Sequence, residues 1–225
     1  DTPPLDVRSA VQGLLSYPYG CVEQTTSSAY PHLFIDEDRA RLLGLKPFTL
    51  AERNEMIAKA ISRLSAQQAA SGGFSLWGGA NNSEYWLSAY VANFLQDARD
   101  QGFEVPAAMQ KKTMDFLLKE LQEGISGISG EAVQVDPENH WRDWLYAGSG
   151  RFNVLAYGGY VLAREARAPL STLRQLYELR GSAASGLSLV QLGLALHLMG
   201  DADKGTVAIS EGLQKPRLQG YWWGD

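Results

Sequence analysis

Cysteine and histidine are scarce in this chain. Its 225 residues contain one cysteine, Cys21, and three histidines, scattered at positions 32, 140 and 197. A single cysteine cannot form an internal disulfide, and no CxxC pair is present that could hold a metal or carry out redox chemistry. The sequence therefore predicts no disulfide framework and no zinc site, and we expect no metal and no cofactor.

Positive charge and long apolar runs are also lacking. The chain has 20 basic and 25 acidic side chains and a formal net charge of −5. No stripe of Lys and Arg is visible, which argues against a nucleic-acid partner. No apolar run approaches the roughly 20 residues that span a bilayer. The chain begins at Asp1 without a secretion-signal pattern, so we interpret it as a processed product or a piece of a longer protein.

The apolar residues that are present recur at helical spacing, and strand alternation is missing. Thr49 and Glu52 have the spacing of a capping box at the start of a helix. Pro106 and Pro169 stand where the first turn of a helix tolerates proline. Residues 187–199 are apolar nearly all round, which predicts a helix buried on several sides. The chain is predicted to be all-α, and its length suggests one large domain.

The predicted helices form a loose repeat. A segment around Tyr90 is echoed around Tyr157, and the separation accommodates a helix pair with its connections. Repeated helix pairs bury their apolar faces by stacking on neighbours, in an open solenoid or a closed ring. Glycine–aromatic loops at residues 72–79 and 220–224 separate helices, and we expect the six tryptophans to pack at such turns. Because the first loop leads into a helix, we expect the natural domain to continue past Asp225.

The segment Tyr-Pro-Tyr-Gly-Cys-Val-Glu-Gln at residues 17–24 carries the most specific chemical signal. Cys21 stands at the predicted start of a helix, where the positive end of the helix dipole makes a cysteine a better nucleophile. Gln24 lies three residues on, within reach across one helical turn. If the thiolate attacks the Gln24 amide and ammonia leaves, the two side chains close into an internal thioester, an activated acyl group. Glu23 between them would point to the side.

The residues Gly-Cys-Val-Glu-Gln at 20–24 resemble the GCxEQ thioester motif of the α2-macroglobulin and complement superfamily. The preceding Tyr-Pro-Tyr is similar to the bacterial branch of that family. Further similarity in the first glycine–aromatic loop and in the helix repeat extends the resemblance over nearly the whole chain. It implies that residues 1–225 are a thioester-containing domain with the α/α-toroid fold, a ring of helix hairpins, and that they are a fragment of a larger multidomain protein.

The same resemblance implies a broad-spectrum protease inhibitor rather than an enzyme. Cleavage of a bait region elsewhere in the protein would expose the thioester, and a protease nucleophile such as a lysine amine would attack the acyl carbon from Gln24. The protease would stay covalently attached and Cys21 would be released, so each molecule would react once. Expected partners are target proteases and the other domains of the full-length chain.

The bacterial family also implies a place in the cell. The full-length protein is expected to be a periplasmic lipoprotein with a role in bacterial defence. Its inner-membrane anchor would be a lipid on a part of the protein outside this fragment.

Other side chains are candidates for supporting roles. Tyr17 and Tyr19 flank the cysteine, and they would either cover the thioester against water or merely pack the turn. In complement relatives a histidine in roughly the region of His140 takes over the acyl group or acts as a base, so His140 is a candidate for that role. Without it, the acyl group should favour amines or water. We expect His197, in an apolar helix, to be a satisfied core residue, and His32 to lie more than two turns from Cys21 without a role.

Other functions fit parts of the sequence. In a cysteine hydrolase, Cys21 would be the nucleophile and His140 the base. Asp136 or Asp143 would orient the histidine. A carbohydrate enzyme of α/α-toroid fold would use Asp136, Glu138 and Asp143, but these carboxylates cluster in one loop instead of lying at the ends of several helices. A non-covalent binding scaffold would make the cysteine an ordinary buried thiol and would leave the Gly-Cys-Val-Glu-Gln motif unexplained.

Overall fold

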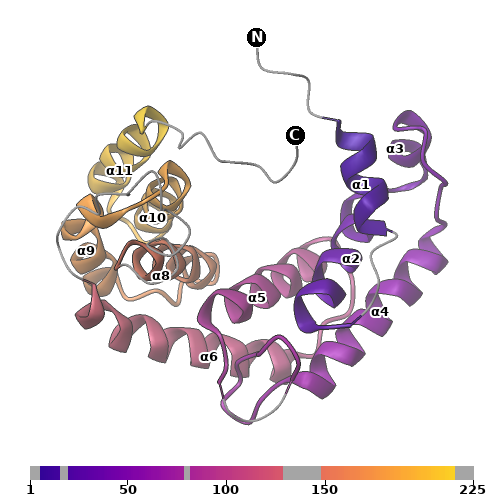
Figure 1. Ribbon diagram of the computed structural model, residues 1–225, viewed down its shortest axis with the longest axis horizontal. Helices are drawn as coiled ribbons and strands as arrows, with labels where there is room; N and C mark the ends of the chain where they lie inside the picture. Colours follow the sequence, from indigo (N-terminus) through magenta and orange to yellow (C-terminus); the bar gives the residue numbers. More distant parts are fainter. Residues whose placement is uncertain (1–5, 16–19, 79–81, 129–147, 216–225) are drawn as a thin grey trace, which may run out of the picture. The chain divides into compact units, whose positions relative to one another are not determined.

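The computed structural model describes residues 6–15, 20–78, 82–128 and 148–215 of the chain. All regular structure in these ranges is helical, which confirms the all-α prediction (Figure 1). The contacts divide the chain into two compact units, Asp1–Phe116 and Leu117–Asp225, with the boundary inside helix α6. The α-helices are α1 Val7–Leu15, α2 Val22–Phe34, α3 Glu37–Leu42, α4 Leu50–Gln67, α5 Tyr85–Asp100, α6 Ala107–Gly124, α8 Gly148–Ala163, α9 Leu170–Glu178, α10 Gly186–Leu198 and α11 Ala202–Gln214. Two short 3₁₀ helices, η1 Ile125–Gly127 and η2 Arg180–Ser182, lie between them.

The first unit is organised around α2, which contacts both α4 and α5. Apolar side chains from these three helices, together with Phe74 from the loop before α5, form its core. Burying a large apolar side chain stabilises the folded state by about 1.5–3 kcal/mol, so this cluster holds the three helices together. The largest side chains of the cluster are Leu33, Ile57, Leu64, Phe74, Leu87, Phe94 and Leu95.

Helix α4 begins where the capping box predicted. Thr49 N donates to Glu52 Oε2 at 2.7 Å, and Glu52 N donates to Thr49 Oγ1 at 3.2 Å. Further along, Arg53 reaches the C-terminal end of α2, where its Nε donates to the His32 carbonyl at 2.7 Å and its Nη2 donates to the Leu33 carbonyl at 3.0 Å. The last carbonyls of a helix lack partners within the helix, so Arg53 fastens the end of α2 to α4.

In the second unit, α10 and α11 approach each other backbone to backbone at two glycine pairs. A Cβ on Gly193 would lie 2.7 Å from the Gly205 carbonyl oxygen, and one on Gly186 would lie 2.2 Å from the Gly212 carbonyl oxygen. Glycine inside a helix costs about 1 kcal/mol relative to alanine. The close approach of the two backbones is therefore what requires glycine at these positions.

Helix α10 is less buried than its composition predicted. Leu192 and Leu196 are fully buried, whereas Leu187, Leu194 and Leu198 are exposed, the first of them at 66%. Among the described residues, α10 contacts α8, α9 and α11, and the exposed leucines lie together on the side that these helices leave open. The expectation of burial on several sides is wrong here, because hydropathy states which side chains gain from burial and does not supply the neighbours that bury them.

The glycine–aromatic loop of the first unit gives a mixed result. Phe74 is fully buried, as expected of an aromatic that fills a gap at a turn. Trp77 is 77% exposed, and Trp86 is partly exposed with its indole N–H donating to Glu84 Oε2 at 2.6 Å. The expectation that the tryptophans pack at turns is therefore wrong for these two. The other four tryptophans, at 141, 144, 222 and 223, lie outside the described residues.

Candidate functional site

Cys21 is the N-cap residue of α2, with an extended backbone (φ −99°, ψ 174°). Its Sγ accepts a hydrogen bond from Gln24 N at 3.5 Å, and Gln24 Oε1 accepts one from Cys21 N at 3.2 Å. The two bonds form a capping box in which cysteine stands where serine or threonine is usual. The Cys21 side chain is buried, with 6% of the residue exposed. The structure thus places the two predicted partners across one helical turn, while the bond between them stays a prediction.

Gly20 leaves room for the Gln24 side chain. A Cβ at position 20 would lie 2.5 Å from Gln24 Oε1, which is closer than real side chains approach. The Gly20 carbonyl accepts a hydrogen bond from Arg63 Nη2 of α4 at 3.0 Å. The residue before the cysteine is therefore fixed by a neighbouring helix and kept clear for the glutamine.

The glycine–aromatic loop docks on the same turn. Val22 N, the first amide of α2, donates to the Leu76 carbonyl at 2.9 Å. On the other side of the loop, Phe74 N donates to Ser88 Oγ of α5 at 2.9 Å, and Glu84 N donates to the Phe74 carbonyl at 2.7 Å. The loop therefore ties the beginning of α2 to the beginning of α5.

A run of hydroxyl side chains follows Gln24 inside the helix, and it is buried. Thr25 Oγ1 donates to the Cys21 carbonyl at 2.9 Å, and Thr26 Oγ1 donates to the Val22 carbonyl at 2.8 Å. Buried hydroxyls are costly unless they form hydrogen bonds, and these bond to the backbone of their own helix. The first turn of α2 gains extra bonds to its carbonyls in this way.

A chain of hydrogen bonds leads from Glu23 to α5. Ser27 Oγ donates to Glu23 Oε1 at 2.8 Å, and it lies 3.0 Å from Tyr90 OH. Burial raises the pKa of Tyr90 above its usual value; the Ser27 hydroxyl opposes this, and the nearby Glu23 charge adds to it. The phenol thus keeps its proton at physiological pH.

A second polar group lies along the same helix pair. Tyr30 OH donates to Asp97 Oδ2 at 2.8 Å and accepts a hydrogen bond from Asn93 Nδ2. The Tyr30 ring stacks on the Tyr90 ring with centroids 5.6 Å apart. Two tyrosines, one from each helix, therefore serve the α2–α5 interface with different polar partners.

A cavity of about 370 Å³ opens beside the first turn of α2. Its lining includes buried Thr25 from α2 and, from α4, Met56, Lys59, Ala60 and Arg63. Because Arg63 also holds the Gly20 carbonyl, the cavity adjoins the residues around Cys21.

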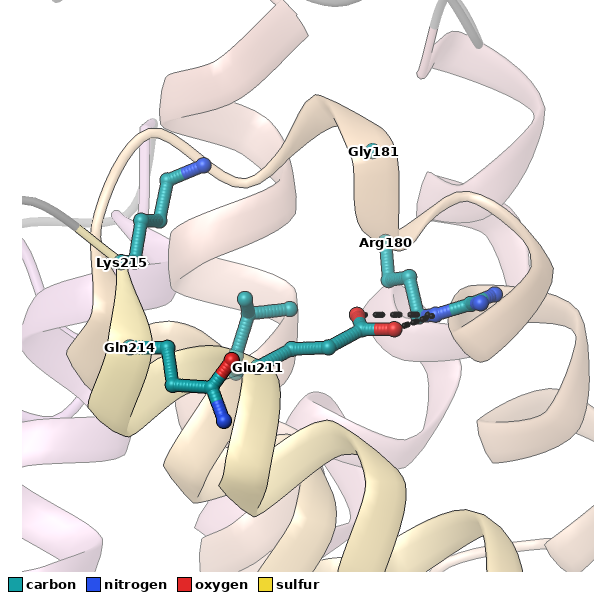
Figure 2. Close-up of a pocket in the computed structure, with 6 residues that line it drawn as sticks. Arg180, Gly181, Glu211, Gln214 and Lys215 are labelled. Atoms are coloured by element: carbon teal, nitrogen blue, oxygen red, sulfur yellow. Dashed lines mark hydrogen bonds and ion pairs between the residues drawn. The ribbon is translucent and has the colours of Figure 1, made fainter.

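The second unit has a larger cavity of about 500 Å³ (Figure 2). Arg180 and Glu211 of its lining form an ion pair, with Arg180 Nε 3.0 and 3.3 Å from the two Glu211 oxygens. Gln214 and Lys215 of its rim extend from the end of α11. The two opposite charges satisfy each other, so we do not assign chemistry to this cavity.

The two described histidines lie away from the chemistry. His32 is buried in α2 with its ring edge-to-face against Phe48, at a centroid distance of 5.0 Å. Burial, and secondarily the Arg53 charge, lower the pKa of His32 below its usual value. His197 is exposed on α10, where its Nε2 lies 3.2 Å from Thr206 Oγ1. The expectation of a core histidine is wrong at 197, because its ring lies at the exposed edge of the contact between α10 and α11, beside Gly205 and Thr206.

Several candidates lie outside the described residues. These are the two tyrosines before the motif, the candidate histidine and the loop carboxylates: Tyr17, Tyr19, His140, Asp136, Glu138 and Asp143. Their proposed roles stay predictions.

Sequence reasoning missed Arg63, Leu76, Ser27 and Tyr90 as neighbours of the site. Each reaches the first turn of α2, or the Glu23 side chain in it, through a contact that its local pattern does not show. The run of four hydroxyl residues directly after Gln24 was a usable signal, because so many polar residues in a helix need a special environment.

The described ranges contain neither a helix that could span a membrane nor a cluster that could bind a metal ion. No described helix combines the length and the apolar character that crossing a membrane requires. Within those same residues, no three His, Cys, Asp or Glu side chains come together as a set that could hold a metal ion.

The sequence matches a family described as "A-macroglobulin TED domain" over residues 4–136. It is 40% identical to an α-2-macroglobulin of Escherichia coli strain K12, over 99% of this chain and 13% of that protein. It is 41% identical to an α-2-macroglobulin of Xylella fastidiosa strain Temecula1, over 94% of this chain and 12% of that protein. The chain thus spans about an eighth of the length of these relatives.

Solved structures give the same match. One is native α-2-macroglobulin from Escherichia coli, spanning domain MG7 to the C-terminus, with a TM-score of 0.81 and 39% identity over 96% of this chain and 32% of that chain. Another is Salmonella α-2-macroglobulin reacted with methylamine, with a TM-score of 0.81 and 37% identity over 99% of this chain and 14% of that chain. The fold class is therefore the expected all-α class of the α/α-toroid type.

Proposed function

The chain belongs to the α-2-macroglobulin family and corresponds to the TED, or thioester, domain of its members. We propose that Cys21 and Gln24 form an internal thioester that traps proteases covalently. The observation that carries the proposal is the reciprocal capping box between these two side chains. It supports the proposal because ring closure needs the sulfur and the glutamine side chain on the same turn.

Thioester formation would exchange one leaving group. The Cys21 sulfur attacks Cδ of Gln24, the carbon–nitrogen bond breaks, and the amide nitrogen leaves as ammonia with the thiol proton. Holding both groups in one turn replaces a bimolecular encounter with an intramolecular one, which greatly raises the effective concentration. The burial of Cys21 limits access of water to the product.

Trapping would then be a single acyl transfer. A neutral lysine amine of the protease attacks the acyl carbon, the carbon–sulfur bond breaks, and Cys21 leaves as a thiol with one amine proton. The product is an amide between the former Gln24 side chain and the protease. The protease stays attached through this amide, so the protein is an inhibitor that reacts once rather than an enzyme.

Relatives supply the partner class. Structures of Escherichia coli α-2-macroglobulin are described as trypsin-activated and as activated by porcine elastase. We extend this to the present chain as proposals: its targets are proteases, and the full-length protein is a periplasmic lipoprotein anchored through a part outside residues 1–225. We also propose that these residues form one thioester-containing domain of that protein. Fractionation of cells that express the full-length protein tests the location.

The thioester is tested by intact mass and thiol titration. Freshly purified protein should be lighter by one ammonia and should show no titratable thiol until methylamine is added. The variants Cys21→Ala and Gln24→Glu should have the full mass calculated from their sequences. Gln122→Glu, the same change on the exposed side of α6, should behave like wild type. Full mass with a reactive thiol from the start in wild type would contradict the proposal.

The same variants address the cysteine hydrolase alternative. That mechanism needs a base such as His140, which lies outside the described residues, and it does not need the glutamine. Peptide or ester hydrolysis with repeated turnover that survives Gln24→Glu and is lost in Cys21→Ala would support the hydrolase over the thioester.

A further inference from the structure

We propose that Ser27 and Tyr90 are positioning residues for the thioester, because they hold the Glu23 side chain, and with it the first turn of α2, against helix α5. This inference rests on the proposed function and assigns a role within it to residues outside the Gly-Cys-Val-Glu-Gln motif.

The hydrogen bonds that join Glu23, Ser27 and Tyr90 have a defined direction. The single hydroxyl hydrogen of Ser27 is donated to Glu23 Oε1 at 2.8 Å. The 3.0 Å contact between Ser27 Oγ and Tyr90 OH must then use the hydrogen of Tyr90. Burial raises the pKa of Tyr90, so its hydroxyl remains a donor across the physiological range. The order is therefore Tyr90 to Ser27 to Glu23.

This series of hydrogen bonds ends at Glu23, in the turn of α2 that reacts. Glu23 stands between Cys21 and Gln24, and the first turn of a helix has fewer internal hydrogen bonds than the turns after it. Reactions between neighbouring groups depend on alignment, and a displacement of about 1 Å can cost about a hundredfold in rate. A link from residue 23 to a second helix restrains the turn in which the ring closes.

Other contacts hold the same turn from other directions. Leu76 accepts from Val22 N at 2.9 Å, and Arg63 donates to the Gly20 carbonyl at 3.0 Å. Both of these contacts act on the backbone. The Ser27–Tyr90 pair is distinct because it acts through the side chain of a residue between the two reacting partners, and it uses a buried serine hydroxyl and a half-buried phenol.

The structure offers a matched control at Tyr30. It lies in the same α2–α5 interface and stacks on Tyr90, and its hydroxyl bonds to Asp97 and Asn93 of α5. Tyr30→Phe and Tyr90→Phe each remove one oxygen from the same interface. Tyr90→Phe alone removes the hydrogen bond to Ser27.

The experiment measures thioester opening in the full 225-residue chain. For wild type, Tyr90→Phe, Ser27→Ala and Tyr30→Phe, the rate constant for methylamine-dependent thiol release is measured, together with the fraction lighter by one ammonia and the thermal midpoint. Tyr90→Phe and Ser27→Ala should open about fivefold faster and carry a smaller closed fraction, as expected for loss of one hydrogen bond that holds the turn. Tyr30→Phe should stay within about twofold of wild type.

Variants of Glu23 separate positioning from proton transfer and remain informative if Tyr90→Phe fails to fold. Glu23→Gln keeps an oxygen that accepts from Ser27, so it should resemble wild type, whereas Glu23→Ala should open about fivefold faster. Equal opening rates in Tyr90→Phe and Tyr30→Phe would overturn the inference, as would a Glu23→Gln variant as impaired as Glu23→Ala. A wild-type chain without a thioester would overturn the proposed function itself, and the inference with it.

Discussion

Helices α2 and α10 are both 13 residues long, but they use polarity in opposite ways. Helix α2 carries the run Thr-Thr-Ser-Ser and is buried along most of its length, whereas α10 is mostly apolar and leaves three leucines exposed. The hydroxyls of α2 bond to its own carbonyls and to neighbouring side chains, which offsets the cost of their burial. Helix α10 instead packs against α11 through glycine.

The two helices contribute to the structure in different ways. The hydrogen bonds of α2 fix the orientation of its first turn, and that orientation matters because the side chains of Cys21 and Gln24 have to meet there. The glycine pairs of α10 fix only a distance between two backbones, which suffices for stacking helices.

The largest effect is expected at the buried side of α10. Leu192→Ala should lower the free energy of unfolding by about 3 kcal/mol, because it leaves a cavity in place of a fully buried side chain. Leu187→Ala, at the exposed side of the same helix, should change it by less than about 0.5 kcal/mol. Urea unfolding measures both. A large cost at Leu187 would mean that the open side of α10 is covered, and the contrast with α2 would fail.

The glycine contact should be the next most sensitive. Gly193→Ala places a Cβ 2.6 Å from Ile209 Cγ1 and 2.7 Å from the Gly205 carbonyl oxygen, so the helices must separate at a cost of about 2 kcal/mol. Gly181→Ala, where a Cβ would meet nothing within 4 Å, is the matched control and should lie within about 0.5 kcal/mol of wild type. Equal midpoints in urea for the two variants would refute close packing of α10 on α11.

A smaller effect is expected from a single hydroxyl of α2. Thr26→Val removes the buried bond from Oγ1 to the Val22 carbonyl and should cost about 1 kcal/mol. Thr206 makes the corresponding bond to the Ala202 carbonyl at an exposed position of α11. Thr206→Val should therefore be nearly neutral in the same unfolding measurement, at most about 0.5 kcal/mol. If both substitutions are neutral, the buried hydroxyl of α2 contributes no more to the free energy of unfolding than the exposed one of α11.

The smallest effect concerns pH. Because the pKa of His32 is lowered in the folded chain, the unfolded chain takes up the proton first as the pH falls. The stability that comes from keeping His32 neutral is fully present above its unfolded pKa, about 6.5, and is lost as the pH falls through the folded pKa. His32→Gln should therefore lose less stability than wild type between about pH 7.5 and pH 5.

The matched substitution for that experiment is His197→Gln, at the exposed histidine of α10. It shows how much of the change comes from loss of a histidine elsewhere in the chain. Unfolding curves of His32→Gln and wild type that shift equally with pH would contradict a buried, neutral His32.

Local features of this molecule were predictable from the sequence, and contacts between distant segments were not. The start of α2 at Cys21, the reach of Gln24 and the capping box at Thr49 depend on residues three positions apart. The hydrogen bond of Arg63 to Gly20 and that of Tyr90 to Ser27 join residues 43 and 63 positions apart, and only the packing of helices brings them together.

The errors of the sequence analysis have the same cause. The exposure of the tryptophans of the first unit, of three leucines in α10 and of His197 depends on which neighbours are present, and a hydropathy pattern carries no such information. The all-α fold, by contrast, follows from periodicity summed over many helices, so single misplaced side chains did not affect it.

Peptide mapping after methylamine treatment reports on the bond between Cys21 and Gln24. If that bond forms, methylamine appears as an amide on the side chain of Gln24, and a thiol label then reacts with Cys21 only in the treated protein. An unmodified Gln24, with Cys21 labelled equally before and after treatment, would contradict the proposed bond.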